Sequence, residues 1–175
     1  MTDGRSVWLL RHAKAVVDPP PGGGDHERPL SAKGRRDAAA LGRRLGDSGD
    51  RFGLGSFPQL VLCSTATRTR ETTERVLADL AQPPAVRYLR EIYEASPGDV
   101  IEQLAAVEDD VRSVMVVGHN PTMEELASTL DRGKKRRHAP RALPTCALAV
   151  FSFESTWAEV APGSASGVKL FVPPF

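Results

Sequence analysis

The fold is decided by a stretch near the start of the chain, Val7-Trp8-Leu9-Leu10-Arg11-His12-Ala13. Four apolar residues run directly into an arginine and a histidine, where charged side chains are expected only if a strand ends there. A short continuous apolar run is typical of a strand that is buried on both faces of a parallel sheet. In open α/β sheets, ligands bind beyond the carboxyl ends of such strands. The stretch therefore predicts a buried strand that presents Arg11 and His12 to a ligand.

The same pattern recurs far along the chain, where Val114-Met115-Val116-Val117 runs into Gly118-His119-Asn120-Pro121. Two buried strands thus each deliver a histidine at their carboxyl end. Taken by itself, His119 also fits a turn histidine that bonds a backbone carbonyl. Together with Arg11 and His12, it favours a shared pocket for an anion.

Composition sets the class of protein. The 175 residues, 41% hydrophobic and 26% charged, suit a single domain spanning 1–175. A net charge of +1 gives no basic field for nucleic acid, so none is expected as a partner. We expect a cytoplasmic protein without membrane contact, because no apolar run approaches the ~20 residues of a spanning helix and the first residues lack a signal-peptide pattern. Cys63 and Cys146 are expected to be reduced core residues.

Apolar runs alternate with helical patterns along the chain. Besides the two strands above, strands are expected at 60–63, 86–89, 147–153 and 168–172. Helices are expected from the N-cap Ser31 to the 46–49 region, over 65–80, from Pro97 to Val107 and over 122–130. This alternation predicts an α/β fold, a three-layer α/β/α sandwich with a largely parallel central sheet.

A third group of residues begins where the second strand is expected to end, at Ser64. Arg68 follows one turn later, near the start of the next helix. A helix N-terminus favours anions through its free N–H groups, and arginine binds a phosphoryl group with two parallel hydrogen bonds. Arg68 could instead pair with Glu71 on the same helix. With Arg11 on the opposite wall, the two arginines and two histidines describe a phosphate site.

Phosphoryl transfer at such a site needs a nucleophile and charge neutralisation. The chain has neither a glycine-rich nucleotide loop nor clustered acidic residues for paired magnesium ions, so no cofactor and no metal is expected. A neutral imidazole is a nucleophile when its other ring nitrogen donates to a fixed acceptor. His12 is therefore predicted to take the phosphoryl group, and water to hydrolyse the phosphohistidine. Arg11, Arg68 and His119 would stabilise the charge on the phosphoryl oxygens.

These motifs resemble those of the histidine phosphatase superfamily, which has a phosphoglycerate-mutase-like fold. The resemblance rests on Arg11-His12 after a strand, Ser64-x-x-x-Arg68-x-x-x-Thr72 and Gly118-His119-Asn120-Pro121. Within the superfamily the short chain is similar to SixA-type phosphohistidine phosphatases, through Glu27-Arg28-Pro29-Leu30-Ser31-x-x-Gly34 and Ile92-Tyr93-Glu94-Ala95-Ser96-Pro97. The resemblance implies that His12 is the phosphorylated nucleophile and that Arg11, Arg68 and His119 form the phosphate pocket. Ala13 replaces the usual glycine, which we interpret as a mark of the SixA-like subgroup.

The general acid is less clearly indicated. Superfamily esterases use a carboxylate to protonate the leaving group, and Glu91 falls near the corresponding place. Three roles remain open for Glu91: the acid, a substrate contact, or an ion-pair partner of Arg90 or Arg87. A phosphohistidine substrate has a better leaving group than an ester and demands less help from an acid.

Further charged and polar residues are candidates for the rim of the site. Asn120 is a candidate substrate contact, and Asp18 and Arg28 could line the pocket mouth, although ordinary loop charge is favoured for both. His26 is expected to be solvated. The basic run 134–138, KKRRH, is interpreted as a solvated loop rather than a rim that steers an acidic substrate.

The sequence thus predicts a metal-independent phosphatase that works through a phosphohistidine on His12. Its expected partner is a phosphorylated protein or a small phosphorylated metabolite, with phosphohistidine in a protein favoured. Two alternatives stay open: a small-molecule phosphomonoesterase of the same superfamily, and a catalytically silent phosphate-binding module.

Overall fold

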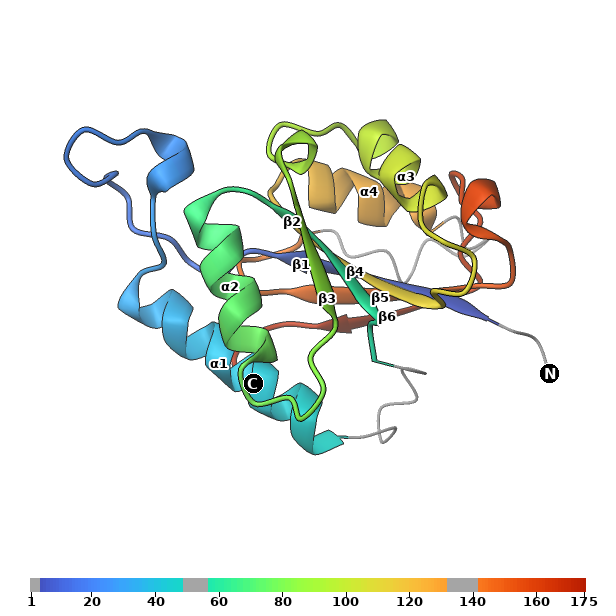
Figure 1. Ribbon diagram of the computed structural model, residues 1–175, viewed down its shortest axis with the longest axis horizontal. Helices are drawn as coiled ribbons and strands as arrows, with labels where there is room; N and C mark the ends of the chain where they lie inside the picture. The colour runs from blue at the N-terminus through green and yellow to red at the C-terminus, as the bar shows by residue number, and fades with distance from the viewer. Residues whose placement is uncertain (1–3, 49–56, 132–141) are drawn as a thin grey trace.

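The computed structural model describes residues 4–48, 57–131 and 142–175, and these ranges form a six-stranded sheet covered by helices on both faces (Figure 1). The strands are β1 (Arg5–Arg11), β2 (Leu60–Ser64), β3 (Ala85–Leu89), β4 (Ser113–Gly118), β5 (Leu148–Phe153) and β6 (Gly167–Phe171). The α-helices are α1 (Ala32–Ser48), α2 (Thr67–Leu77), α3 (Pro97–Ala105) and α4 (Thr122–Leu130). Short 3-10 turns are η1 (Asp25–Glu27), η3 (Arg90–Ile92) and η4 (Trp157–Glu159).

The strand order is β3-β2-β4-β1-β5-β6. The first four strands of the chain run parallel to their neighbours among themselves, while β5 lies antiparallel to β1 and to β6. The prediction of a largely parallel central sheet is therefore confirmed, with an antiparallel addition at one edge. The sheet is therefore mixed, with parallel pairs from β3 to β1 and antiparallel pairs on both sides of β5.

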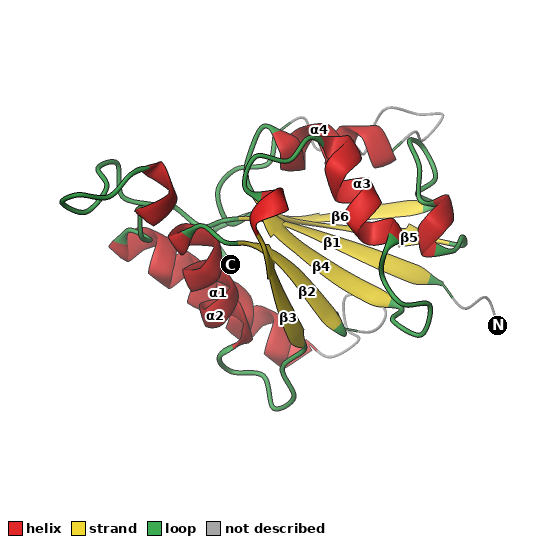
Figure 2. Ribbon diagram, turned by 45° about the horizontal axis from the view of Figure 1, so that its top comes forward, coloured by secondary structure: helices red, strands yellow, loops and turns green. Residues whose placement is uncertain are grey.

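The two faces of the sheet bury alternate residues of each strand, as the pleat requires. Trp8 and Leu10 of β1 belong to the apolar cluster that contains the inner faces of α1 and α2. Val7 and Leu9 belong to the cluster under α3 and α4 on the opposite face. Figure 2 shows the two helix pairs on either side of the sheet. The predicted three-layer sandwich is confirmed.

The helices differ from their predicted bounds mainly at α2, which is shorter at both ends. Ala66 before it is extended, with ψ 146°, because the chain must turn from β2 into the helix. At the other end Leu80 closes a separate turn onto the carbonyl of Leu77 at 3.2 Å. Both cysteines are free and buried, as expected. The basic run 134–138 lies outside the described residues.

The connection from β1 to α1 packs tightly against the start of that helix. The Ser31 hydroxyl accepts a hydrogen bond from the Gly34 N–H at 3.1 Å, so Ser31 is the N-cap that the sequence predicts. A Cβ on Gly34 would lie 2.1 Å from the carbonyl oxygen of Lys14. Only glycine allows this close approach, which fixes the backbone two residues after His12. None of the described helices is long and apolar enough to span a membrane.

Candidate active site

The register of the parallel strands brings the two predicted histidines together. Arg11 pairs with Gly118 at the end of the β1–β4 ladder, and the His12 N–H donates to the Gly118 carbonyl at 3.1 Å. The ring centroids of His12 and His119 lie 5.1 Å apart. On the other side of β4, strand β2 ends with Ser64. Three segments far apart in sequence thus meet at one edge of the sheet.

A cavity of about 460 Å³ opens at this edge. Its described lining consists of Arg11, His12, Lys14, Ala15, Asp25, Arg28, Arg68, His119, Asn120 and Thr145. The structure therefore brings together six of the predicted site residues and excludes two, Glu91 and Asp18, from the described wall. The excess of basic side chains in the wall suits an anionic ligand.

His12 is held in one tautomer by the backbone of the residue that follows it. Its Nδ1 lies 2.7 Å from the carbonyl oxygen of Ala13. Because a carbonyl can only accept, Nδ1 must carry the proton, which leaves the lone pair of Nε2 free. Burial, and then the nearby arginines, lower the pKa of His12 to about 4. The imidazole is thus neutral at physiological pH, the state that a nucleophile requires.

The Ala13 backbone that orients His12 is itself held from α2. The Ala13 N–H donates to Thr72 Oγ1 at 3.0 Å, and the Thr72 hydroxyl donates to the Arg68 carbonyl at 2.6 Å. Thr72 is completely buried. This contact gives a structural reason for the threonine in the Ser64-to-Thr72 motif.

His119 is oriented by the end of β2. Its Nε2 lies 2.8 Å from the Ser64 hydroxyl, while its Nδ1 is buried and has no hydrogen-bond partner among the described residues. Burial is the main cause that lowers the pKa of His119 to about 3, followed by the positive charges nearby. An anion in the cavity would offset both effects, because opposite charge favours the protonated ring.

Both predicted arginines are fixed and retain unused donors. Arg11 donates to the Leu143 carbonyl through one guanidinium nitrogen at 2.7 Å. The Nε atoms of Arg11 and Arg68 are buried without a partner in the described part of the chain. Glu71, the alternative partner of Arg68, accepts instead from the Leu30 N–H at 2.9 Å. Arg68 faces the cavity and is only 5% exposed.

Asn120 lies at the start of the loop into α4, against the same wall. Its amide nitrogen donates to Glu124 at 2.6 Å and to the Leu143 carbonyl at 3.1 Å. Its Oδ1 is buried without a partner in the ranges described. The side chain can therefore accept one hydrogen bond from a ligand or from water.

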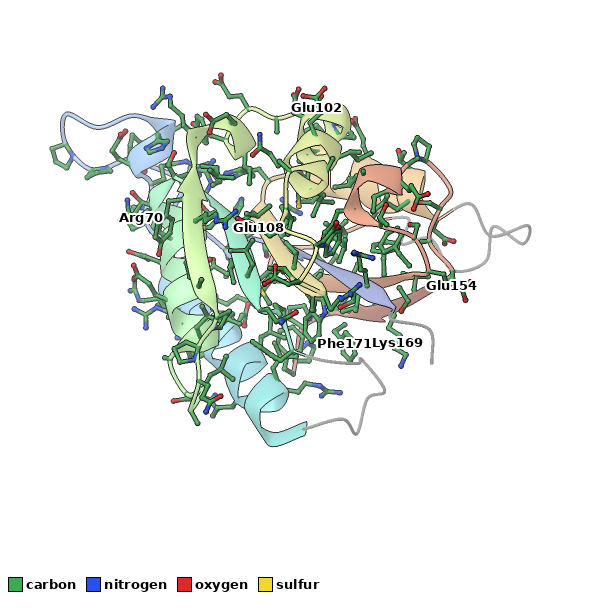
Figure 3. All side chains as sticks on the ribbon, turned by 45° about the vertical axis from the view of Figure 1, so that its right-hand side comes forward. Arg70, Glu102, Glu108, Glu154, Lys169 and Phe171 are labelled. Atoms are coloured by element: carbon green, nitrogen blue, oxygen red, sulfur yellow. The ribbon has the colours of Figure 1, made fainter. Side chains whose placement is uncertain are left out.

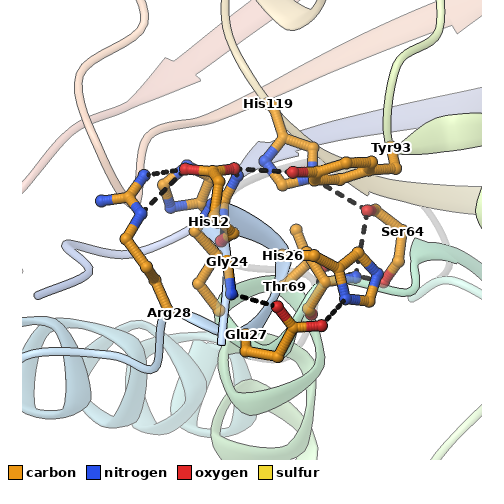
Figure 4. Close-up of polar contacts among 12 residues, drawn as sticks. His12, Gly24, His26, Glu27, Arg28, Ser64, Thr69, Tyr93 and His119 are labelled. Carbon is orange, nitrogen blue, oxygen red and sulfur yellow. Dashed lines mark hydrogen bonds and ion pairs between the residues drawn. The ribbon is translucent and has the colours of Figure 1, made fainter. Parts of the chain in front are cut away.

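Asp25 is a site residue that the sequence reasoning did not single out. One of its carboxylate oxygens accepts from Arg28, with Nε at 2.8 Å and Nη2 at 2.7 Å. The other accepts from Arg68 at 2.9 Å and from the Tyr93 hydroxyl at 2.7 Å (Figure 4). The hydrogen bond from Tyr93 is the main cause that holds the pKa of Asp25 well below its usual range, with the two arginines adding to it. Asp25 lies two residues before the quoted Glu27-to-Gly34 motif, and its i,i+3 spacing from Arg28 was the available signal.

His26 and Tyr93 form an aromatic wall beside His119. The rings of His26 and Tyr93 meet edge to face with centroids 4.9 Å apart, and Tyr93 meets His119 in the same way at 5.5 Å. His26 Nε2 lies 2.9 Å from the Thr65 hydroxyl. The expectation of a solvated His26 is therefore wrong: the ring is partly buried because η1 folds back against the start of α2.

Glu91 and Asp18 lie apart from the cavity wall. Glu91 is exposed in the 3-10 turn η3, and Asp18 is exposed in a bend of the β1–α1 connection. The predicted roles of these two residues stay predictions that the described geometry does not support. Within the described residues, no group of three or more His, Cys, Asp or Glu side chains could hold a metal ion.

Comparison with known proteins gives consistent matches. Residues 7–100 match the family described as the histidine phosphatase superfamily (branch 1). The uncharacterized protein Rv1276c of Mycobacterium tuberculosis is 39% identical over 94% of this chain and 99% of its own length. The fold resembles SixA from Agrobacterium tumefaciens, with a TM-score of 0.76, 30% identity and coverage of 97% and 99% of the two chains. It also resembles the protein histidine phosphatase SixA complexed with tungstate, with a TM-score of 0.71, 25% identity and coverage of 93% and 95%.

Proposed function

The chain belongs to branch 1 of the histidine phosphatase superfamily and is a phosphatase, and we propose that it removes the phosphoryl group from phosphohistidine in a protein. The similarity to SixA structures at 25% and 30% identity supports this choice of substrate within the superfamily. Tungstate is a tetrahedral oxyanion like phosphate, so its complex with SixA supports an oxyanion site in the same fold.

The observation that carries the proposal is the fixed tautomer of His12. The contact of Nδ1 with the Ala13 carbonyl, at 2.7 Å, leaves Nε2 as the nucleophile. In the first step Nε2 attacks phosphorus, and the bond from phosphorus to the substrate nitrogen breaks. In the second step water attacks the phosphorus of phospho-His12, and the electron pair of the N–P bond returns to Nε2. Orthophosphate is released.

Basic side chains that line the cavity stabilise the negative charge on the phosphoryl oxygens. Arg11 and Arg68 offer planar guanidinium groups that bind two oxygens at once. The Nδ1 of His119 has no partner among the described residues, and it supplies a further donor once the ring is protonated beside the bound anion. We propose that these cations carry the charge compensation without a metal ion.

The test is turnover in the presence of EDTA of two substrates, a phosphohistidine-bearing protein and p-nitrophenyl phosphate. We expect the wild type to dephosphorylate the phosphohistidine and His12→Ala to lose the activity entirely. Faster turnover of the ester than of the phosphohistidine would indicate a small-molecule phosphomonoesterase. Binding of inorganic phosphate without turnover of either substrate would leave a catalytically silent binding module. Restoration of lost activity by added divalent cations would contradict metal independence.

A further inference from the structure

Asp25 is the single carboxylate in the described wall of the cavity. Asp25 stands at the start of η1 and is half-exposed, with 53% of its side chain accessible. Its carboxylate takes up donors from both Arg28 and Arg68, and its backbone carbonyl accepts a further bond from Arg68 at 2.7 Å. One acidic residue therefore occupies the guanidinium groups that a phosphoryl group would bind.

A carboxylate and a phosphoryl group use an arginine in the same way, through two parallel N–H donors. Arg28 and Arg68 cannot give the same donors to both. A phosphoryl group that takes the Nη donors now bound to Asp25 must displace the Asp25 carboxylate, which stays tethered at the cavity by the backbone of η1. The displaced carboxylate then faces the phosphoryl group instead of the arginines.

We propose that Asp25 is the acid–base residue of this phosphatase and that the incoming phosphoryl group releases it from Arg28 and Arg68. The proposal rests on the proposed function. It assigns proton transfer to a residue of the β1–α1 connection, since Glu91, the carboxylate suggested by the sequence, is exposed and does not line the described cavity.

The chemistry balances in two steps. In the first, His12 Nε2 forms a bond to phosphorus while the substrate N–P or O–P bond breaks. The departing nitrogen or oxygen takes the proton of Asp25, which becomes a carboxylate. In the second, that carboxylate accepts a proton from the attacking water, and the N–P bond to His12 breaks. The products are orthophosphate and Asp25 in its acid form. When orthophosphate leaves, Asp25 returns to the arginines as a carboxylate and gives its proton to solvent, and it takes up a proton from solvent again when the next phosphoryl group displaces it.

The surroundings of Asp25 explain how one residue can serve both steps. In the free site the Tyr93 hydroxyl and the arginines hold the pKa of Asp25 far below neutrality, so the group is a carboxylate. Displacement removes these donors and places the group beside a dianion, and both changes raise its pKa. Arg11, Lys14, His12 and His119 also face the cavity and limit the rise.

The test compares esters whose leaving groups differ. With p-nitrophenyl phosphate the leaving group departs readily, whereas phenyl phosphate needs a proton. We expect Asp25→Asn to lower kcat for phenyl phosphate by at least ~100-fold and for p-nitrophenyl phosphate by less than ~10-fold. Glu94→Gln, which removes an exposed carboxylate near η3, is the matched control and should leave both rates unchanged.

A positioning role for Asp25 predicts a different result, namely equal losses for both esters, chiefly in KM. Equal losses, or no loss, would overturn the proposal, and so would a leaving-group-dependent loss in Glu91→Gln with none in Asp25→Asn. The affinity for inorganic phosphate provides a second measurement that needs no turnover. Asp25→Asn should bind phosphate at least ~10-fold more tightly, because no carboxylate competes for the arginines. Unchanged affinity would refute displacement even if the wild type proved inactive, an outcome that by itself would refute only the proposed function.

Discussion

The Nδ1 atom of His12 lies 2.7 Å from the carbonyl oxygen of Ala13, so the nucleophile is oriented by the residue that directly follows it. This contact and the buried position of the ring define its ionisation. Burial is the largest cause of the lowered pKa, ahead of the charges of Arg68 and Arg11.

We therefore predict that His12 in the ligand-free protein titrates with a pKa of about 4 rather than 6.5. The measurement is an NMR titration of the imidazole signals, with His12→Ala used to assign them. Arg68→Gln removes a positive charge and should raise the value. A His12 titration near 6.5 would show that the ring is solvated and would remove the basis for a neutral nucleophile at mildly acidic pH.

Stability should also depend on pH, because the pKa values of His12 and His119 are lowered to about 4 and about 3. Between pH 6.5 and 4 these histidines are protonated in the unfolded chain but neutral in the folded protein. The free energy of unfolding therefore decreases as pH falls. We expect a loss of at least ~1 kcal/mol per histidine across this window, measured by urea denaturation. His119→Asn should make the pH dependence shallower. An unchanged dependence in that variant would contradict the prediction.

Arg68 should not be replaceable by lysine, although the charge is kept. The guanidinium presents two Nη donors from a 5% exposed position, as its contacts with Asp25 show, and an ammonium cannot offer the same pair to a phosphoryl group. We expect Arg68→Lys to lower kcat/KM about 100-fold, or about 3 kcal/mol. Arg70→Lys is the matched control on the same helix, since Arg70 lies on the outer side of α2 over Tyr88 (Figure 3). Similar losses in both variants would assign the effect to α2 as a whole.

The main features of the fold and the central residues of the site could be predicted from the sequence for the same physical reason. Apolar runs that end in Arg11-His12 and Gly118-His119 mark strands whose carboxyl ends must lie at one edge of a parallel sheet. Local pattern and general topology together place these residues, with no knowledge of the loops.

Asp25 and Tyr93 could not be predicted in this way, because their positions depend on how two loops fold over the edge. Asp25 and Tyr93 are 68 residues apart in the sequence. No local pattern in either segment predicts the hydrogen bond between them. The direction of β5 could not be predicted either, because an apolar run has the same sequence pattern whether the strand lies parallel or antiparallel to its neighbour.

Thr72 should be important for activity through the backbone that it holds. Thr72→Val leaves the buried Ala13 N–H without its acceptor, which lowers the free energy of unfolding by about 1–3 kcal/mol. The Ala13 backbone, whose carbonyl orients His12, then loses the hydrogen bond that holds it. We expect kcat/KM to fall about 10-fold with little change in helix content, measured by steady-state kinetics and circular dichroism. Thr73→Val is the control, because the Thr73 hydroxyl donates to the Thr69 carbonyl at 2.9 Å within α2 and contacts Cys63 rather than Ala13. If Thr73→Val lost as much activity, buried hydroxyls of α2 in general would be responsible.

Gly34 should tolerate no side chain. A Cβ there would lie 2.1 Å from the Lys14 carbonyl oxygen, and because the contact is with backbone, only a shift of α1 or of the loop after His12 relieves it. We expect Gly34→Ala to lower the free energy of unfolding by at least ~2 kcal/mol and to reduce activity as well, because the loop carries Ala13. Gly46→Ala in the same helix is the control: its nearest neighbour would be a Leu80 methyl at 3.9 Å. Alanine there should be neutral or stabilising by up to ~1 kcal/mol, since glycine is the poorer helix former. The measurement is the free energy of unfolding of the two variants by chemical denaturation. An equal change in both would mean that helix propensity, and not the close approach of Gly34 to Lys14, determines the effect at both positions.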